Sequence, residues 1–382
     1  MRRRMRGIAV AAIALTSVLS MAACAKDSGG NNTGSGQGNN AEGCKLADKP
    51  PAAAAGSSTA SSGEKIDGSA LKVGLAYDIG GRGDASFNDS AAAGLDKAKA
   101  EYGLKPENVK ELTAAPNEPE DAKQTRLRQL ASEGYNPIIG VGFAYAESLG
   151  VVAPEFPNVK FAIVDGAVEG AANVTPLVFA EQQGSFLAGV IAAYKSKSCH
   201  VGFVGGVEIP LIQKFDAGFE QGAKAAAPDI KIERKYLTPA GDFTGFQDPT
   251  KGQEAATGQI EAGADVLYHA AGASGKGVFS AAKAGNALAI GVDSDQYNQT
   301  TVAESKDVIV SSMLKRVDVA VFDFVGAVAK NDLASLPKVF DLSVDGVGYA
   351  TSGGKIDADL QAVLEGYKAQ IIKGEITVKD SL

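Results

Sequence analysis

Short apolar runs alternate with longer helix-like segments from residue 72 towards the end of the chain, and few fold classes fit such an alternation. The runs that we predict as strands are 72–77, 137–142, 160–165, 200–205, 230–236, 265–270, 288–293 and 307–312. The segments that we predict as helices lie near 88–102, 119–134, 181–196, 211–227, 249–263, 314–330 and 357–373. Strands separated by helices are typical of parallel sheets built from βαβ units, and near-continuous Val and Ile runs fit strands covered on both faces. The sequence therefore predicts an α/β protein.

The folded body, residues 69–382, is long enough for two lobes with separate cores. Its predicted strands form a first group ending near residue 178 and a second group from about 200 to 293, so we predict two doubly wound lobes. Ligands of such sheets bind at the carboxyl ends of the strands. This rule selects the residues that end strands: Asp78 with the turn after it, Gly142 and Phe143, Asp165, Ala270–Gly277 and Asp293.

The first 68 residues predict export and a tether. Residues 1–23 combine four arginines with a short apolar run, which is the layout of a signal peptide. The sequence "SMAAC" resembles a bacterial lipobox, in which the cysteine, here Cys24, becomes lipidated. Ordinary cleavage nearby, giving a free secreted protein, is the alternative. Residues 24–68 are rich in Gly, Asn, Ser and Ala and predict a flexible linker. No second apolar stretch reaches the ~20 residues that cross a bilayer.

The net charge, the cysteines and the histidines limit which partners, disulfides and metal sites the chain can have. Because the signal carries four Arg and no acidic residue, its removal takes the net charge from −8 to about −12. Such a negative net charge argues against nucleic acid as a partner.

Besides Cys24 the chain has Cys44 and Cys199, which outside the cytoplasm predict one disulfide, with two free thiols as the alternative. His200 and His269 add too few ligands for a metal site, and we expect neither metal nor cofactor.

Enzyme motifs are weak in this sequence. "GVGFAY" (140–145) lacks the third Gly of a dinucleotide fingerprint, and "ASGKGVF" (273–279) lacks the flanking residues of a P-loop. No G-x-S-x-G elbow is present. Asp78 with Asp84 or Asp89 would serve as a glycosidase pair, but acids beside glycine in loops usually cap turns and helices. We expect no enzymatic activity and keep hydrolysis as the alternative to be tested.

The stretch "YDIGGRGDASFND" (77–89) resembles the signature D-x-G-G-x-x-D-x-S-F-N of the basic membrane protein family of bacterial lipoproteins. Further similar blocks follow in order, among them "FPNVKFAIVD" (156–165), "EQQGSFLAGVIAA" (181–193), "FQDPTKGQEAA" (246–256) and "AIGVDSDQ" (289–296). The resemblance implies a type I periplasmic-binding-protein fold, two doubly wound parallel-sheet lobes joined by a hinge. It places residues 69–178 with 307–335 in the N-terminal lobe and 179–306 with 336–382 in the C-terminal lobe.

The best-described members of this family are purine nucleoside receptors of ABC importers, and the resemblance assigns roles on that basis. Asp78 and Asn88 would bind the edge of a base, with Phe87 stacking on one face. Phe246 would stack on the other face, although the segment 240–249 leaves Phe243 as its rival. The ribose hydroxyls would be held by Asp165, Asp293 and Lys315, with the backbone of the segment "AAGASG", at Gly272, nearby.

Two positions depart from the family pattern, since Arg82 and Lys276 stand where apolar residues are usual. Asp84 and Asp89 are expected to shape the turn rather than bind the ligand.

The resulting hypothesis is a monomeric, lipid-anchored, extracytoplasmic substrate-binding protein. It would capture a nucleoside, with purine nucleosides expected first, and present it to an ABC permease in the membrane. Closure about the hinge would follow from a ligand that binds both lobes. The alternatives are the same fold binding a sugar or other small polar ligand, and a surface sensor lipoprotein without an importer.

Overall fold

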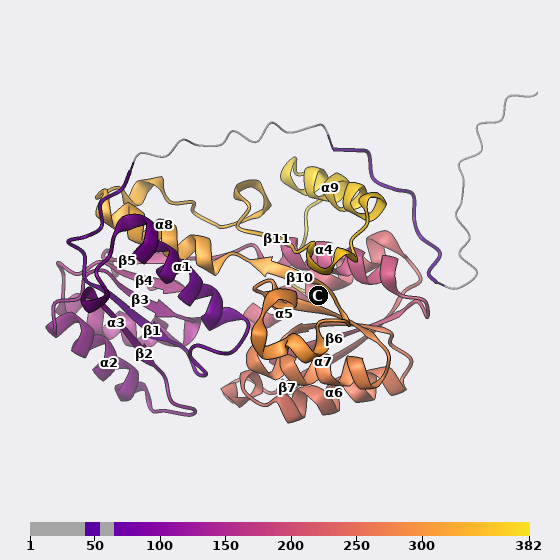
Figure 1. Cartoon of the computed structure of the whole chain (residues 1–382), viewed down its shortest axis with the longest axis horizontal. Coiled ribbons are helices and arrows are strands. Elements are labelled where there is room, and N and C mark those ends of the chain that lie inside the picture. Colours follow the sequence, from indigo (N-terminus) through magenta and orange to yellow (C-terminus); the bar gives the residue numbers. More distant parts are fainter. Residues whose placement is uncertain (1–42, 54–64) are drawn as a thin grey trace, which may run out of the picture. The chain divides into compact units, whose positions relative to one another are not determined.

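The computed structural model describes residues 43–53 and 65–382, drawn as coloured ribbon in Figure 1. The predicted signal peptide, Cys24 and most of the linker lie outside the described residues. The candidate lipid anchor therefore remains a prediction from the sequence.

The first lobe is a five-stranded parallel sheet in the order β2-β1-β3-β4-β5. Its strands are β1 (Val73–Tyr77), β2 (Val109–Thr113), β3 (Ile138–Val141), β4 (Phe161–Val164) and β5 (Val174–Leu177). Alternate side chains of β1 point to opposite faces. Leu75 packs in the same core as Leu95 of α1 (Phe87–Tyr102), whereas Ala76 packs with Leu127 of α2 (Glu120–Ser132). A short helix, α3 (Ala146–Val152), joins the second of these cores.

The second lobe is a six-stranded sheet in the order β11-β10-β9-β8-β6-β7. Its strands are β6 (His200–Val207), β7 (Lys231–Thr238), β8 (Val266–Ala270), β9 (Leu288–Asp293), β10 (Ile309–Lys315) and β11 (Val347–Tyr349). All pair in parallel except β11, which runs antiparallel to β10. Its helices are α4 (Glu181–Lys195), α5 (Pro210–Ala226), α6 (Pro249–Glu261), α7 (Gly275–Ala284) and α9 (Ala358–Ile372). The backbones of α4 and α5 touch, since a Cβ on Gly222 would lie 1.8 Å from the carbonyl oxygen of Phe186.

The expected lobe boundary at residue 307 is wrong for β10. Val308, Ile309 and Val310 are buried, and β10 pairs in parallel with β9, so this strand extends the second sheet. Only α8 (Val317–Ala329) from the segment 307–335 belongs to the first lobe, where it packs beside α1 (Figure 1). The rings of Tyr102 on α1 and Phe322 on α8 stack at 4.5 Å.

Three segments cross between the lobes: 178–180, residue 316 with its neighbours, and 330–346. Two of them are joined, because the Ala180 amide donates to the Phe340 carbonyl at 3.1 Å and the Phe340 amide donates to the Val178 carbonyl at 2.9 Å. These paired segments form the natural hinge between the lobes.

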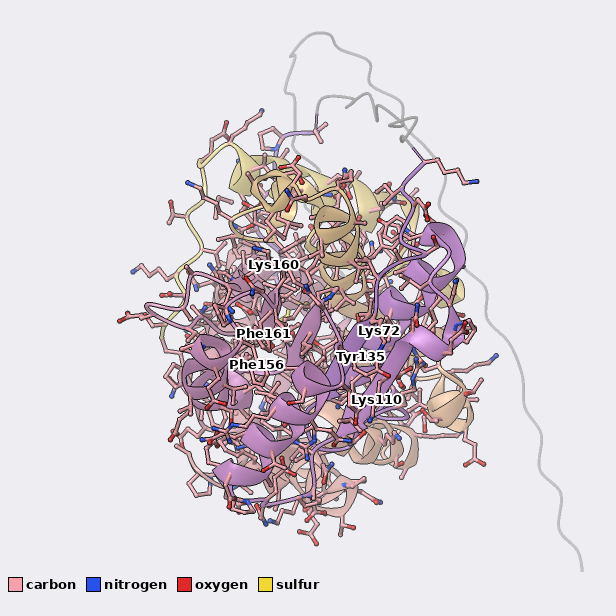
Figure 2. All side chains as sticks on the ribbon, turned by 90° about the vertical axis from the view of Figure 1, so that its left-hand side faces the viewer. Lys72, Lys110, Tyr135, Phe156, Lys160 and Phe161 are labelled. Atoms are coloured by element: carbon pink, nitrogen blue, oxygen red, sulfur yellow. A yellow bond between two sulfur atoms is a disulfide. The ribbon has the colours of Figure 1, made fainter. Side chains whose placement is uncertain are left out.

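The amino-terminal ends of the first lobe's strands carry lysines. Figure 2 shows this lobe with Lys72, just before β1, next to Tyr135; its Nζ lies 5.1 Å from the ring centroid. Lys110 in β2 pairs with Glu133 at 2.6 Å, and Lys160 stands just before β4. Carboxylates, in contrast, follow the opposite ends of β1 and β4, at Asp78 and Asp165, which makes that edge the candidate for a site.

The start of the described chain is fastened to the second lobe. A disulfide joins Cys44 to Cys199, the same two cysteines that the sequence left as a pair or as free thiols. The Ala47 amide also donates to the Ala226 carbonyl at 2.8 Å. Within the two described ranges, no helix combines the length and apolar character needed to span a bilayer.

Candidate ligand-binding site

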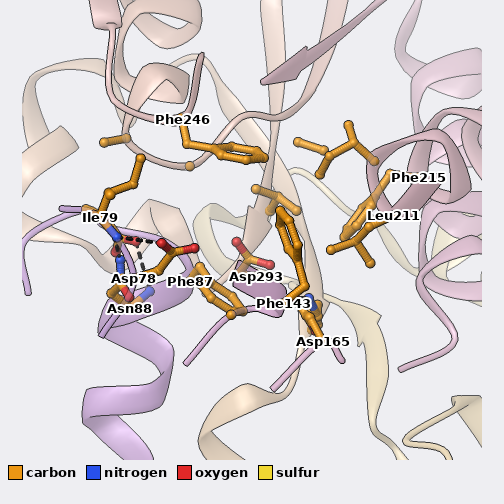
Figure 3. Close-up of a pocket in the computed structure, with 18 residues that line it drawn as sticks. Asp78, Ile79, Phe87, Asn88, Phe143, Asp165, Leu211, Phe215, Phe246 and Asp293 are labelled. Atoms are coloured by element: carbon orange, nitrogen blue, oxygen red, sulfur yellow. Dashed lines mark hydrogen bonds and ion pairs between the residues drawn. The ribbon is translucent and has the colours of Figure 1, made fainter. Parts of the chain in front are cut away.

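A pocket with an empty volume of about 630 Å³ lies at the carboxyl ends of the strands, between the two lobes (Figure 3). All eight residues that the resemblance assigned to the ligand line this pocket: Asp78, Phe87, Asn88, Asp165, Phe246, Gly272, Asp293 and Lys315. Residues separated by more than two hundred positions are thus brought together, while their roles in binding remain proposals.

Asp78 directly follows β1 and is held by its own turn. Its Oδ1 accepts a hydrogen bond from the Ile79 amide at 2.7 Å. Its Oδ2 lies where a Cβ on Gly142 would come within 2.7 Å, and Gly142 has a φ of 110°, so only glycine fits there. Burial raises the pKa of Asp78 to about 6, which leaves a carboxylate at neutral pH that gains from a donor.

The turn between β1 and α1 is built by two other carboxylates. Asp84 accepts hydrogen bonds from the amides of Ser86 and Asn88 at 2.9 and 2.8 Å. Asp89 accepts from the amides of Gly83 and Ala85 at 2.7 and 2.8 Å. Both carboxylates therefore shape the turn, although Asp84 also lines the pocket.

Asn88 offers an acceptor at the base of the same turn. Its Nδ2 donates to the Ile79 carbonyl at 3.1 Å, while its buried Oδ1 has no hydrogen-bond partner in the part of the chain that the structure describes. Buried polar atoms are nearly always paired. An unpaired amide oxygen in a pocket lining points to a ligand donor.

Two phenylalanines stand on opposite sides of the pocket in Figure 3, Phe246 from the second lobe and Phe87 from the first. Phe243 belongs to the same short 3₁₀ helix as Phe246 but is not among the lining residues. Its ring packs edge-on against Phe143 with the centroids 5.5 Å apart. The geometry therefore favours Phe246 over Phe243 as the ring that faces a ligand.

Two cations depart from the family pattern, Arg82 and Lys276, and both bind other groups of the protein outside the pocket. Arg82 pairs with Asp96 at 2.9 Å and with Glu111 at 2.6 Å, and Lys276 donates to the Gly83 carbonyl at 2.6 Å. Neither side chain lines the pocket. Their positive charges therefore do not alter the lining directly.

Lys315 forms a buried ionic cluster at the base of the pocket. Its ammonium donates to Asp165 Oδ2 and lies 3.9 Å from Glu181 Oε1. Burial by itself would lower the pKa of Lys315, but the charges of Asp165, Glu181 and Asp293 outweigh it and raise that pKa. Three rings surround the ammonium at 4.9 to 5.6 Å from their centroids: Phe87, Phe179 and Phe215. A charged lysine is thus fixed beside the carboxylates.

Asp165 and Asp293 occupy equivalent places in the two lobes. Asp165 follows β4, the fourth strand of the first sheet, and Asp293 ends β9, the corresponding strand of the second. Both have a φ of 63°, a left-handed conformation that is strained for a residue with a Cβ and is concentrated at functional sites. Asp293 also accepts from the Ser86 hydroxyl, and burial raises its pKa to about 6.

The β1–α1 turn of the first lobe is bonded to the second lobe. Gln296 Nε2 donates to the Ala85 carbonyl at 3.0 Å, and the Ser294 hydroxyl donates to the Ser86 carbonyl at 2.8 Å. The Ala85 methyl is fully buried in a second-lobe core. Together with the Lys276 bond to Gly83, these contacts form a latch across the pocket.

Sequence reasoning missed one wall of the site. Leu211, Ile212 and Phe215, from the first turns of α5, line the pocket, and Phe143 had been selected only as a strand-end residue. Apolar side chains on a helix look like core residues in a sequence, so no local signal marks them.

Neither histidine lines the pocket. Across 43–53 and 65–382, no three His, Cys, Asp or Glu side chains are grouped as metal ligands. His200 instead pairs with Glu233 at 3.0 Å, and burial lowers the pKa of His269 to about 4.

Comparison with known proteins places the chain in a family. Residues 70–381 match the Bmp model, described as ABC transporter substrate-binding protein PnrA-like. An ABC transporter nucleoside-binding protein, BmpA of Lactococcus lactis, is 32% identical, with 81% of this chain and 89% of the relative covered. An uncharacterized lipoprotein of Pyrococcus furiosus is 33% identical, with 82% of each chain covered.

A solved structure of a similar fold supports the same assignment. It is the solute-binding protein of an ABC transporter system from Aeropyrum pernix, with a TM-score of 0.67 and 28% identity over 80% of this chain and 92% of that one. The periplasmic-binding-protein architecture expected from the resemblance is thereby confirmed, and so is the resemblance itself. The chain belongs to the Bmp family of PnrA-like ABC transporter substrate-binding proteins.

Proposed function

We propose that this protein binds a nucleoside, purine nucleosides first, and delivers it to an ABC permease. The observation that carries the proposal is the pair of rings, Phe87 and Phe246, that stand on opposite sides of the pocket and come from different lobes, with carboxylates between them. A purine has two π-faces and a polar edge, and stacking on an aromatic side chain is worth ~1–3 kcal/mol per base in related settings. The name of the Lactococcus lactis relative supports the same ligand class.

The polar residues fit the two ends of a nucleoside. Asp78 and the unpaired Oδ1 of Asn88 are acceptors suited to the N–H groups of a base edge. Asp165, Asp293 and Lys315 suit the two hydroxyls of a ribose, since charge-assisted hydrogen bonds are the stronger kind. The two groups of residues are thus matched to base and sugar separately.

Export and anchoring complete the proposal. As an ABC transporter substrate-binding protein with a lipoprotein relative, the chain is expected to work outside the cytoplasm at the membrane. Lipidation of Cys24 would hold it there through the predicted linker, residues 24–68, which the disulfide at Cys44 joins to the second lobe. Binding without bond breakage is the activity that this family implies.

Calorimetric titration of the full chain tests the ligand class. Bound ligand is first removed by unfolding and refolding with the disulfide intact, and the protein is titrated with adenosine, guanosine, inosine, cytidine, uridine and ribose. We expect sub-micromolar binding of purine nucleosides and no measurable binding of ribose. The absence of measurable binding with every nucleoside would refute the proposal, and tight binding of ribose would favour the sugar alternative.

Two further readouts separate the remaining alternatives. Release of free base from inosine, abolished in Asp78→Asn, would establish hydrolysis. Binding that is lost in Phe246→Ala but kept in Phe243→Ala would support the stacking role of the first ring, because only Phe246 lines the pocket.

A further inference from the structure

One end of the pocket is apolar. It is formed by four side chains without a polar atom: Phe143, Leu211, Ile212 and Phe215. Ile212 and Phe215 are buried, and Leu211 is half-buried. In Figure 3, Leu211 and Phe215 lie on the opposite side from Asp78 and Asn88, with Asp293 between them. The pocket therefore has a polar end, a charged middle and an apolar end.

The charges of the lining disfavour an anion. Four carboxylates line the pocket, from Asp78, Asp84, Asp165 and Asp293. Lys315 is the single cation among the lining residues that the structure describes, and its ammonium is already held by Asp165. A phosphate group entering this pocket would therefore meet more negative than positive charge.

The chemistry of a nucleoside connects these observations, given the nucleoside-binding function proposed above. In the furanose ring C1′ and C4′ flank the ring oxygen on opposite sides. A base at Asp78 and Asn88, with the diol at Asp165 and Lys315, therefore directs C4′ and its C5′ substituent away from the base. The apolar end of the pocket lies in that direction.

None of these four side chains offers a hydrogen-bond partner to a 5′-hydroxyl, and the nearby Lys315 ammonium, 5.6 Å from the Phe215 ring centroid, is already held by Asp165. Burial there is therefore unfavourable for a polar group leaving water. A small apolar substituent at the same carbon would instead be buried against Leu211 and Phe215. We propose that this pocket selects nucleosides with an uncharged, apolar 5′ group, such as 5′-deoxy and 5′-alkylthio nucleosides, and rejects nucleoside 5′-phosphates.

The test compares three forms of one nucleoside on the full chain after ligand removal. Adenosine and guanosine are each titrated as the 5′-hydroxyl, the 5′-deoxy-5′-methylthio and the 5′-monophosphate form. We expect the methylthio form to bind about tenfold more tightly than the hydroxyl form, the gain for burying two methylene-sized groups. The monophosphate is expected to bind about a hundredfold more weakly than the hydroxyl form.

A matched pair of variants tests whether the preference for the methylthio form arises at the apolar end of the pocket. Leu211→Ser should reduce the preference for methylthio over hydroxyl at least threefold. Leu237→Ser changes a leucine of β7 that is also half-buried but does not line the pocket, and it should leave this preference unchanged. Weaker binding of the methylthio form than of the hydroxyl form, or equal binding of the monophosphate, would overturn this inference while nucleoside binding stands. Failure of every form, the parent nucleosides included, would overturn the proposed function and this inference together.

Discussion

Replacing Asp78 by Asn should weaken ligand binding and yet stabilise the ligand-free protein. Burial raises the pKa of Asp78 to about 6, so the ionised carboxylate is less stable in the folded chain than in water. Asn keeps the size of the side chain and an oxygen for the Ile79 amide. It removes the charge, and with it the penalty for burying that charge.

The size of this stabilisation follows from the pKa shift of Asp78. An Asp in an unfolded chain has a pKa near ~3.9, and each unit of difference corresponds to 1.36 kcal/mol. With the folded value at about 6, the variant gains up to about 3 kcal/mol in the free energy of unfolding at pH 7. The same relation gives about 1.5 kcal/mol at pH 5 and about 0.5 kcal/mol at pH 4.

The sign of the pH dependence is fixed by proton binding. A carboxyl whose pKa is raised on folding binds more protons in the folded than in the unfolded chain, so its contribution to stability grows as pH falls from about 7 to about 4. The Asn variant cannot follow this change. Its stability advantage over the natural chain should therefore shrink on acidification.

Urea unfolding of the ligand-free protein at pH 7, 5 and 4 measures this difference. Far-UV circular dichroism is the suitable signal, because the chain has no Trp. Nucleoside affinity at pH 7 should meanwhile fall about ten- to a hundredfold, the range for losing a hydrogen bond to a charged group. A variant that is less stable than the natural chain at pH 7, or an advantage that does not change with pH, would refute this reasoning.

Asp96→Asn is the matched control. Its hydrogen bond to Arg82 lowers the pKa of Asp96, so this carboxylate stabilises the fold above its unfolded pKa and loses that contribution as pH falls. The control variant should be slightly less stable at neutral pH, with unchanged ligand affinity. If Asp78→Asn raises the free energy of unfolding at pH 7 and Asp96→Asn lowers it, the effect of burying a carboxylate is separated from the effect of ion pairing.

Three more predictions concern the rings, the latch and the buried lysine. Phe246→Ala should weaken nucleoside binding about ten- to a hundredfold by calorimetry, while Phe243→Ala should change it less than about threefold; equal losses would contradict the assignment. Gln296→Ala removes the buried bond to the Ala85 carbonyl, and X-ray scattering should show a larger radius of gyration for the ligand-free variant but not for its complex. Lys315→Met leaves buried carboxylates without their cation, so urea unfolding at pH 7 should show a loss of about 3–5 kcal/mol; a loss below about 1 kcal/mol would argue against the ionic cluster.

Most of the strands that could be predicted from the sequence are covered on both faces; β7, at the edge of the second sheet and only partly buried, is the exception. Each of the eight predicted runs overlaps an observed strand, and seven of these strands are mostly buried. Three strands were missed: β2, β5 and β11. In β2 the sequence "VKELT" is half-buried, β5 contains Pro176, and β11 has three residues. Strands at or near a sheet edge are covered less and carry weaker patterns.

Two helices were also missed, for a different reason. The first turn of α7, "GKGV", follows a glycine-rich loop and was weighed as part of a phosphate-binding motif. Its glycines serve packing instead, since a Cβ on Gly277 would lie 1.8 Å from the Pro249 carbonyl oxygen of α6. The short α3 has too few turns for a periodic signal.

The residues of the candidate site that lie in one continuous segment could be predicted from the sequence. Asp78, Phe87 and Asn88 share a single strand-to-helix turn, and the rule for parallel sheets points to that turn directly. Leu211 and Phe215 could not be found in this way, because their apolar side chains match the pattern of any helix that covers a sheet. Glu181, which lies behind Lys315, became visible only once the crossing segments were placed.

The positions of the cross-lobe contacts suggest how ligand binding and closure are coupled. Lys315 ends β10 next to a crossing segment, so its bond to Asp165 lies at the pivot and should change little when the lobes separate. The latch at Ala85 lies on the turn that carries Phe87, away from the crossing segments, and must break on opening. A ligand held between Phe87 and Phe246 binds both lobes on the latch side, and such differential contact is what shifts the population towards the closed state. Under the nucleoside-binding proposal, the pivot would therefore fix the polar residues for the sugar, whereas stacking of the base would drive closure.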